Sequence, residues 1–127
     1  MSQGYLQHIH PVLPVKNLTK AIDYYVNKLG FKLSFKDQGS DPKYAGVGRD
    51  SIEIHLQWHD EKEWDAGIDR PMLRIKTENI DALYEDYKSK SVFHQNTSLK
   101  KTLWGTREFG FYDKDMNGLV FYMNFPT

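Results

Sequence analysis

Cysteine is absent from the 127 residues of this chain. Its absence excludes disulfides, thiolate zinc sites and cysteine nucleophiles, so any bound metal must use nitrogen and oxygen ligands. An excess of charge is absent as well, because seventeen basic residues balance seventeen acidic ones. We therefore expect neither nucleic acid nor a membrane as partner, but a neutral or locally recognised molecule.

Long hydrophobic runs are also lacking. No stretch approaches the roughly 20 apolar residues that span a bilayer, and the first residues show neither the basic start nor the apolar core of a signal peptide. Phosphate-binding loops of the G-x-x-x-x-G-K or G-x-G-x-x-G type and a G-x-S-x-G nucleophile elbow are missing too. We predict a soluble, cytoplasmic protein without nucleotide or serine-nucleophile chemistry.

The length fits one domain, 1–127, which at this size buries roughly two thirds of the surface that an unfolded chain exposes. Residues 5–15 alternate between two sides of an extended chain, with His8 and His10 on the same side. Pro11 and Pro14 favour an edge strand for this segment.

A helix should follow, because Asn17 can cap it and Gly30 can end it. Apolar residues recur at helical spacing between them, at Leu18, Ile22, Tyr25 and Leu29. Strands are then predicted at 31–35, 44–47 and 51–58. In 51–58 the alternation has no exception, and it places Glu53, His55 and Gln57 opposite the apolar Ile52, Ile54, Leu56 and Trp58.

The same order of elements recurs after a charged connector, EKEWDAGIDR. Asn79 can cap a second helix, and strands are predicted before and after it at 71–77, 92–97, 107–112 and 119–125. The sequence therefore predicts an α+β fold with an internal duplication of two strand-helix-strand-strand-strand units, about 5–60 and about 68–127.

Three segments resemble a known superfamily: PVLPVKNLTKAIDYYVNKLGFKL, MLRIKTENIDALYEDYKS and WGTREFGFYDKDMNGLVFYMN. They are similar to the glyoxalase, bleomycin resistance protein and dioxygenase (vicinal oxygen chelate) superfamily, and the last segment points to the resistance proteins. The resemblance implies two βαβββ units whose curved mixed sheets surround a cleft with the helices outside. It also implies a homodimer with a cleft shared between chains, and whether the chains exchange units stays open.

The resemblance further implies four metal-ligand positions, of which His10 and Glu53 match the first two. The third falls on Met72 and the fourth on Tyr122, or on Phe121 or Met123 if the turn glycine is assigned differently. Thioethers and phenols are poor replacements for imidazole and carboxylate around a hard divalent ion. His8 or His55 could supply a third ligand, but we favour hydrogen-bonded side chains without metal or other cofactor.

The chain is rich in aromatic residues, and such residues suit planar or cationic ligands. The candidate ligand-binding residues are His8, His10, Phe35, Tyr44, Glu53, His55, Met72, Trp104, Phe111 and Tyr122. For Trp104, core packing and ligand contact are equally compatible with the sequence. An ion pair between Arg107 and Glu108 is a further expectation. DKDMNG at 113–118 resembles the start of a calcium loop, but a tight turn explains it sufficiently.

The preferred hypothesis is a non-catalytic dimer that binds and sequesters a small amphipathic or aromatic, bleomycin-type molecule in an aromatic cleft. Neutral overall charge argues against bleomycin itself, because resistance proteins of this type tend to carry an acidic cleft. One alternative is a metal-dependent lyase, isomerase or dioxygenase that uses His10, Glu53 and a third ligand from outside the family pattern. A second is a structural dimer whose aromatic residues fill the cleft.

Overall fold

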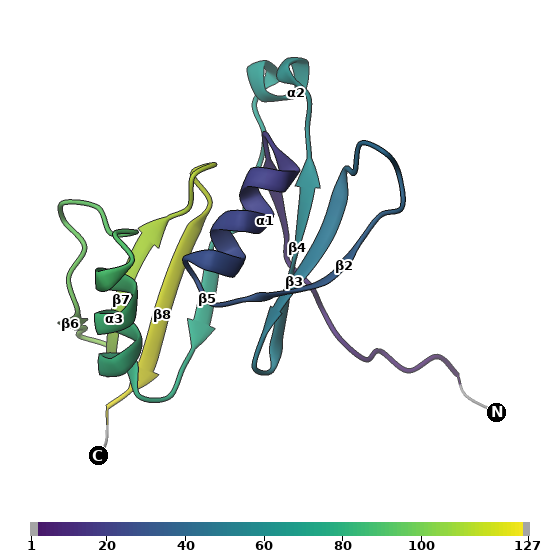
Figure 1. The fold of residues 1–127 in the computed structure, drawn as a ribbon. Helices are drawn as coiled ribbons and strands as arrows, with labels where there is room; N and C mark the ends of the chain where they lie inside the picture. Colours follow the sequence, from purple (N-terminus) through teal and green to yellow (C-terminus); the bar gives the residue numbers. More distant parts are fainter. Residues whose placement is uncertain (1–2, 126–127) are drawn as a thin grey trace.

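The computed structural model describes residues 3–125, so both ends of the predicted domain 1–127 lie outside the described residues. The chain forms two four-stranded mixed sheets with helices, as the sequence predicts. Figure 1 shows the two sheets and the amino-terminal arm, which extends away from them. None of the helices among residues 3–125 has the length and apolar character needed to cross a membrane.

The first unit is a sheet in the order β1-β4-β3-β2. β1 is an edge strand that runs parallel to β4, in agreement with Pro14 within the strand and Pro11 just before it. The strands span Val12–Val15 (β1), Lys32–Lys36 (β2), Tyr44–Arg49 (β3) and Ile52–Trp58 (β4). One face of this sheet is buried against α1, and it carries Leu13, Val15, Ala45, Val47, Ile54 and Leu56.

Helix α1 (Leu18–Asn27) begins and ends where its sequence signals predict. The Asn17 side chain accepts a hydrogen bond from the Lys20 backbone N–H at 3.0 Å. Gly30 lies beyond the helix with a φ of +78°, a conformation that side chains with a Cβ rarely adopt.

The second unit repeats this arrangement in the order β5-β8-β7-β6, and β5 runs parallel to β8. Its strands span Leu73–Lys76 (β5), Lys100–Lys101 (β6), Thr106–Tyr112 (β7) and Gly118–Asn124 (β8). Helix α3 (Ile80–Ser89) begins after Asn79 and lies over β7 and β8 in Figure 1. Tyr84 and Tyr87 of this helix pack in an aromatic core with Phe93, Phe109, Phe111 and Phe121.

Two elements differ from the sequence prediction. The charged connector contains a short helix, α2 (Glu61–Ala66), which projects beyond the end of β4 in Figure 1. The predicted strand at 92–97 is wrong, because this segment forms turns and the strand of that region is β6. Val92 and Phe93 are apolar because they pack beneath α3, and burial there does not require a strand.

The two units pack against each other through buried hydrogen bonds. The Tyr25 hydroxyl of α1 donates to the Asp113 carboxylate at 2.7 Å, and the Tyr87 hydroxyl of α3 donates to the Leu29 carbonyl at 2.8 Å. Both are bonds between residues far apart in sequence, so the two units share one core. Asp113 also accepts hydrogen bonds from the backbone N–H groups of Asp115 and Asn117, which makes 113–118 a tight turn.

Each sheet buries one face and leaves part of the other accessible. Alternation along β4 places Glu53 and His55 on the side opposite Ile54 and Leu56, and we call this side the first open face. Alternation along β7 and β8 likewise defines a second open face, which carries Arg74, Glu108, Gly110, Val120 and Tyr122. Within residues 3–125 the two sheets stay separate and do not close on each other.

Candidate functional site

The first open face is centred on two neighbouring strands, β1 and β4. Their parallel pairing matches Val12 with His55, and the His55 backbone N–H donates to the Pro11 carbonyl at 2.9 Å. This hydrogen bond brings the residue before Pro11, His10, next to the β4 side chains. The pairing of β1 with β4 therefore brings His10 next to His55 and next to Glu53, which lies 43 residues further along the chain.

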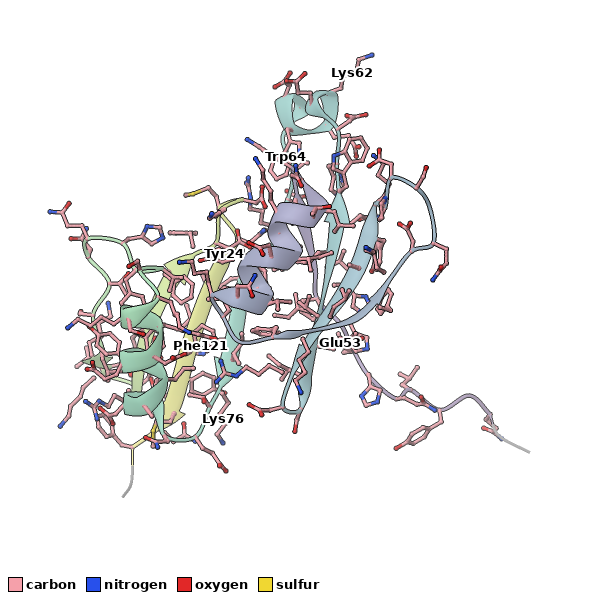
Figure 2. All side chains as sticks on the ribbon, in the orientation of Figure 1. Tyr24, Glu53, Lys62, Trp64, Lys76 and Phe121 are labelled. Carbon is pink, nitrogen blue, oxygen red and sulfur yellow. The ribbon has the colours of Figure 1, made fainter. Side chains whose placement is uncertain are left out.

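Glu53 lies beside both imidazoles. Its Oε2 is 2.9 Å from His55 Nε2 and 3.8 Å from His10 Nδ1. The His10 and His55 rings are nearly parallel, with centroids 4.6 Å apart. Figure 2 labels Glu53 on the sheet of the first unit, well separated from Phe121 and Lys76 of the second.

The Glu53 carboxyl is held in its ionised form. The hydrogen bond from His55 is the largest influence that lowers the pKa of Glu53, and a hydrogen bond from Ser34 acts in the same direction. Partial burial acts oppositely but does not overcome them. The first open face therefore carries a negative charge at neutral pH.

Tyr44 fixes the orientation of His55 from β3. Its hydroxyl is 2.8 Å from His55 Nδ1. Burial raises the pKa of Tyr44, so the phenol stays protonated and can donate to that nitrogen. A phenol that donates to Nδ1 leaves the proton of a neutral His55 on Nε2, where it meets Glu53.

Phe35 joins this face because β2 contains an irregularity. The pairing with β3 shifts between Leu33 and Phe35, so Phe35 lies opposite Gly46 and its ring covers that glycine. A Cβ at Gly46 would overlap the Phe35 ring, which explains glycine at this position. Phe35, Tyr44, His55 and His10 then form a continuous row of rings, which we call the ring ledge.

An open depression of about 770 Å³ lies beside the ring ledge. His8, His10, Ser34 and Glu53 line it, together with Asp86 from the second unit. His8 reaches the ledge only through His10, with ring centroids 5.9 Å apart.

The second open face carries an arginine sandwiched between an acid and an aromatic ring. Arg74 Nη2 is 3.0 Å from Glu108 Oε2, and the guanidinium lies 4.3 Å from the centre of the Tyr122 ring. Burial acts to raise the pKa of Glu108, but hydrogen bonds from Arg74, Thr106 and Trp104 outweigh it and the pKa is lowered. Glu108 is therefore ionised and already neutralised by Arg74.

The structure brings only part of the predicted set together. His8, His10, Phe35, Tyr44, Glu53 and His55 meet on the first open face, and Tyr122 and Trp104 are linked through Glu108 on the second. Met72 precedes β5 and is 76% exposed, and Trp104 is 68% exposed. Phe111 is 3% exposed and packs against Tyr87 of α3, but it also lines a depression of about 420 Å³ on the second unit, so its contact with a ligand stays a prediction.

The expected ion pair between Arg107 and Glu108 is also wrong. Neighbouring residues of a strand point to opposite faces, and Arg107 instead pairs with Asp81 of α3 at 2.9 Å. Sequence reasoning missed Arg74 and Ser34. The alternation of LRIK could have placed Arg74 opposite Leu73 and Ile75, and the alternation of 31–35 could have placed Ser34 opposite Leu33.

The two βαβββ units with open sheet faces have the architecture of the glyoxalase and bleomycin resistance protein fold. The chain belongs to the Glyoxalase/Bleomycin resistance protein/Dioxygenase superfamily, and the sequence model of that family matches residues 6–121. Bleomycin resistance proteins from Geobacillus stearothermophilus and Staphylococcus aureus are 32% identical to it, over 92% of this chain and 96% of theirs.

Solved structures agree on the fold. A bleomycin-binding protein of Streptomyces verticillus, solved with copper(II)-bleomycin, has a TM-score of 0.74 at 23% identity and covers 94% of this chain and 97% of its own. A bleomycin-binding protein solved with bleomycin has a TM-score of 0.76 at 16% identity and covers 94% and 100%. At these identities the similarity concerns the architecture of the two units.

Proposed function

We propose that this protein is a non-catalytic binder that sequesters a bleomycin-type molecule in an aromatic cleft between two copies of the chain. The observation that carries the proposal is the ring ledge on an open sheet face, where Phe35 remains 42% exposed. Flat rings offer a large apolar area with few rotatable bonds, so they suit planar or cationic ligands. The similarity to bleomycin resistance proteins over nearly the whole chain supports a ligand of that type.

A second copy of the chain would complete the cleft. In one chain the first open face adjoins the depression of about 770 Å³, and a separate depression of about 420 Å³ is lined by Met72, Glu108, Gly110 and Val120 of the second unit. A two-fold dimer could set the ring ledge of one copy opposite Tyr122 and Trp104 of the other. The exposure of Trp104 in the single chain supports this arrangement.

Charge on the cleft is local. The chain is neutral overall, so attraction for a cationic ligand must come from individual carboxylates. Glu108 is paired with Arg74, whereas Glu53 faces two imidazoles. Glu53 is therefore the carboxylate that we expect to contact a cationic group of the ligand.

Calorimetric titration with metal-free bleomycin tests the proposal. We expect binding to the unmodified protein and a loss of about tenfold or more in Phe35→Ala, which corresponds to about 1.4 kcal/mol and is typical of a buried aromatic contact. Leu33→Ala is the matched control, because Leu33 lies in the same strand with 44% exposure but pairs with Val47 on the buried side. It should bind like the unmodified protein.

Two outcomes oppose the proposal. Absence of binding at high micromolar protein would remove bleomycin as the ligand, and an equal loss in Phe35→Ala and Leu33→Ala would remove the ring ledge as its site. Light scattering on the same samples measures the molar mass and so shows whether the protein is a dimer. A monomer that binds bleomycin at full affinity would contradict the proposal of a cleft shared between two chains.

A further inference from the structure

We propose that His10, Glu53 and His55 form a site for one divalent transition-metal ion, built from the first unit alone. The proposal goes beyond the ligand binding described above and does not depend on it. One ring nitrogen from each histidine and one carboxylate oxygen lie within 4.8 Å of one another. Two imidazoles and a carboxylate form a donor set that zinc accepts, and imidazole also suits copper and nickel.

The distances between the donor atoms fit a metal after small side-chain rotations. In a tetrahedral site with bonds of about 2.0–2.2 Å, the donors lie about 3.3–3.6 Å apart. Glu53 Oε2 is nearer than this to His55 Nε2, at 2.9 Å, and farther from His10 Nδ1, at 3.8 Å. His10 precedes β1, so its side chain can adjust without disturbing a strand.

His55 is already held in the orientation that a metal ligand needs. Metal-binding histidines usually bond their second ring nitrogen to a partner that fixes the ring and its tautomer. Tyr44 provides this contact at His55 Nδ1, at 2.8 Å. With a metal on Nε2 in place of the contact to Glu53, the neutral ring carries its proton on Nδ1 and donates it to the Tyr44 oxygen, the reverse of the metal-free direction. Tyr44 is therefore a positioning residue for the proposed site.

The structure also resolves the choice of third ligand that the sequence left open. His8 contacts the group only at the far side of His10, with ring centroids 5.9 Å apart, whereas His55 contacts both other members directly. Met72 and Tyr122 of the second unit are not needed. The result is a different set from the four positions spread over both units that the family pattern implies.

An ion bound here would be accessible. His10 and Glu53 line the open depression of about 770 Å³, so water or an oxygen of a ligand could complete the coordination. Three protein ligands plus one exchangeable position is the arrangement of zinc sites that bind further molecules.

A hydrogen-bonded wall without metal is the competing explanation, and the chain offers an internal control for it. His59 Nδ1 lies 2.8 Å from Glu63 Oε2, nearly the same separation as that between His55 and Glu53. The His59–Glu63 pair belongs to no three-donor cluster in the described part of the chain. A pair of this kind alone should not hold a metal ion at micromolar concentration.

Titration of chelator-treated protein with Zn²⁺, followed by calorimetry, tests the site directly. We expect one ion per chain in the unmodified protein and in His59→Ala and His8→Ala, and loss of this binding in His10→Ala and His55→Ala. Tyr44→Phe should retain the ion with about 10- to 100-fold lower affinity, the usual effect of removing a contact to a ligating histidine. Co²⁺ absorption in the visible range reports tetrahedral coordination independently of heat.

The proposal is overturned if the unmodified protein binds no stoichiometric Zn²⁺, or if binding survives in His55→Ala. It is equally overturned if His8→Ala abolishes binding while His55→Ala does not. Circular dichroism of each variant establishes that the fold is retained, so that a lost site is not confused with an unfolded chain. Zn²⁺ titration of Phe35→Ala separates the two proposals, because Phe35 belongs to the ring ledge but supplies no metal ligand, so this variant should still bind the ion after it has lost bleomycin.

Discussion

Single residues on the two open faces hold their charges by different means. Glu53 is ionised next to two imidazoles and remains partly accessible, whereas Glu108 is only 8% exposed and is neutralised by Arg74. An ionised carboxylate that is buried must be hydrogen-bonded and paired, and Glu108 satisfies both conditions. The first face therefore offers charge to a ligand, and the second offers a rigid aromatic surface around Arg74.

Glu108 should make stability depend on acid pH. The pKa of Glu108 is lower in the folded state than in the unfolded chain, so the unfolded chain binds more protons as the pH falls. The stability that Glu108 supplies is present above the unfolded pKa of about 4.3 and disappears as the pH falls through the folded pKa. Urea unfolding between pH 6 and pH 3 should show this loss, and Glu108→Gln should start less stable and lose less over that interval.

Arg74, which pairs with Glu108, and Arg107, which pairs with Asp81, provide the test and the control for this prediction. Arg74→Gln removes the partner of Glu108 and should flatten the pH dependence in the same way as Glu108→Gln. Arg107→Gln removes the partner of Asp81 instead and should retain the Glu108 contribution. Identical pH profiles for the unmodified protein and Glu108→Gln would contradict the assignment.

At the scale of elements, helices α1 and α2 differ in the side chains that they bury. Helix α1 buries Leu18, Ala21, Tyr24 and Tyr25, whereas α2 buries none of its residues. Both have an amino-terminal cap, with Asn17 bonded to the Lys20 N–H and Asp60 bonded to the Glu63 N–H. The two helices therefore have similar amino-terminal caps, but we expect α1 to contribute far more than α2 to the free energy of unfolding.

Substitution of the two capping residues should show that α1 and α2 contribute differently to global stability. Asn17→Ala is expected to lower the free energy of unfolding by about 1 kcal/mol, because α1 folds together with the core. Asp60→Ala should open α2 locally with little global effect, because that helix packs no buried side chain. Urea unfolding measures the first effect and amide hydrogen exchange over 61–66 the second, and equal losses of global stability would contradict this distinction.

Local signals predicted most of the elements, and long-range pairing explains the rest. Asn17, Gly30 and the alternation of β4 were sufficient for α1 and for the placement of Glu53 and His55. The D-x-x-E capping box of Asp60 and Glu63 could have revealed α2. The contact of Arg74 with Glu108 could not be predicted, because it depends on the registers of β5, β8 and β7.

At the scale of the whole molecule, buried polar contacts join the two units. The Asn117 side-chain amide donates to the Pro14 carbonyl of β1 at 3.0 Å, and Tyr25 reaches Asp113 at the turn before β8. Burial raises the pKa of Tyr25 well above its usual value, and the neighbouring Asp113 acts in the same direction. The tyrosine therefore stays a neutral donor at all ordinary pH values.

Loss of this donor should weaken the whole protein in one step. Tyr25→Phe leaves the buried Asp113 with one partner fewer, and we expect a loss of about 1–3 kcal/mol. Tyr24→Phe is the matched control with a smaller expected loss, because Tyr24 contacts Lys114 through its ring. Far-ultraviolet and near-ultraviolet dichroism should report the same urea midpoint for Tyr25→Phe, whereas separate midpoints would show that the units unfold independently.

The ring ledge and the second open face become one functional site only if two copies of the chain meet around a ligand. A crystal structure of the protein with metal-free bleomycin tests this central claim most directly. We predict bleomycin in contact with Phe35 and Tyr44 of one copy and with the Tyr122 and Trp104 side chains contributed by the second copy. Bleomycin held by a single chain, or on the helix-covered faces of the sheets, would contradict the account.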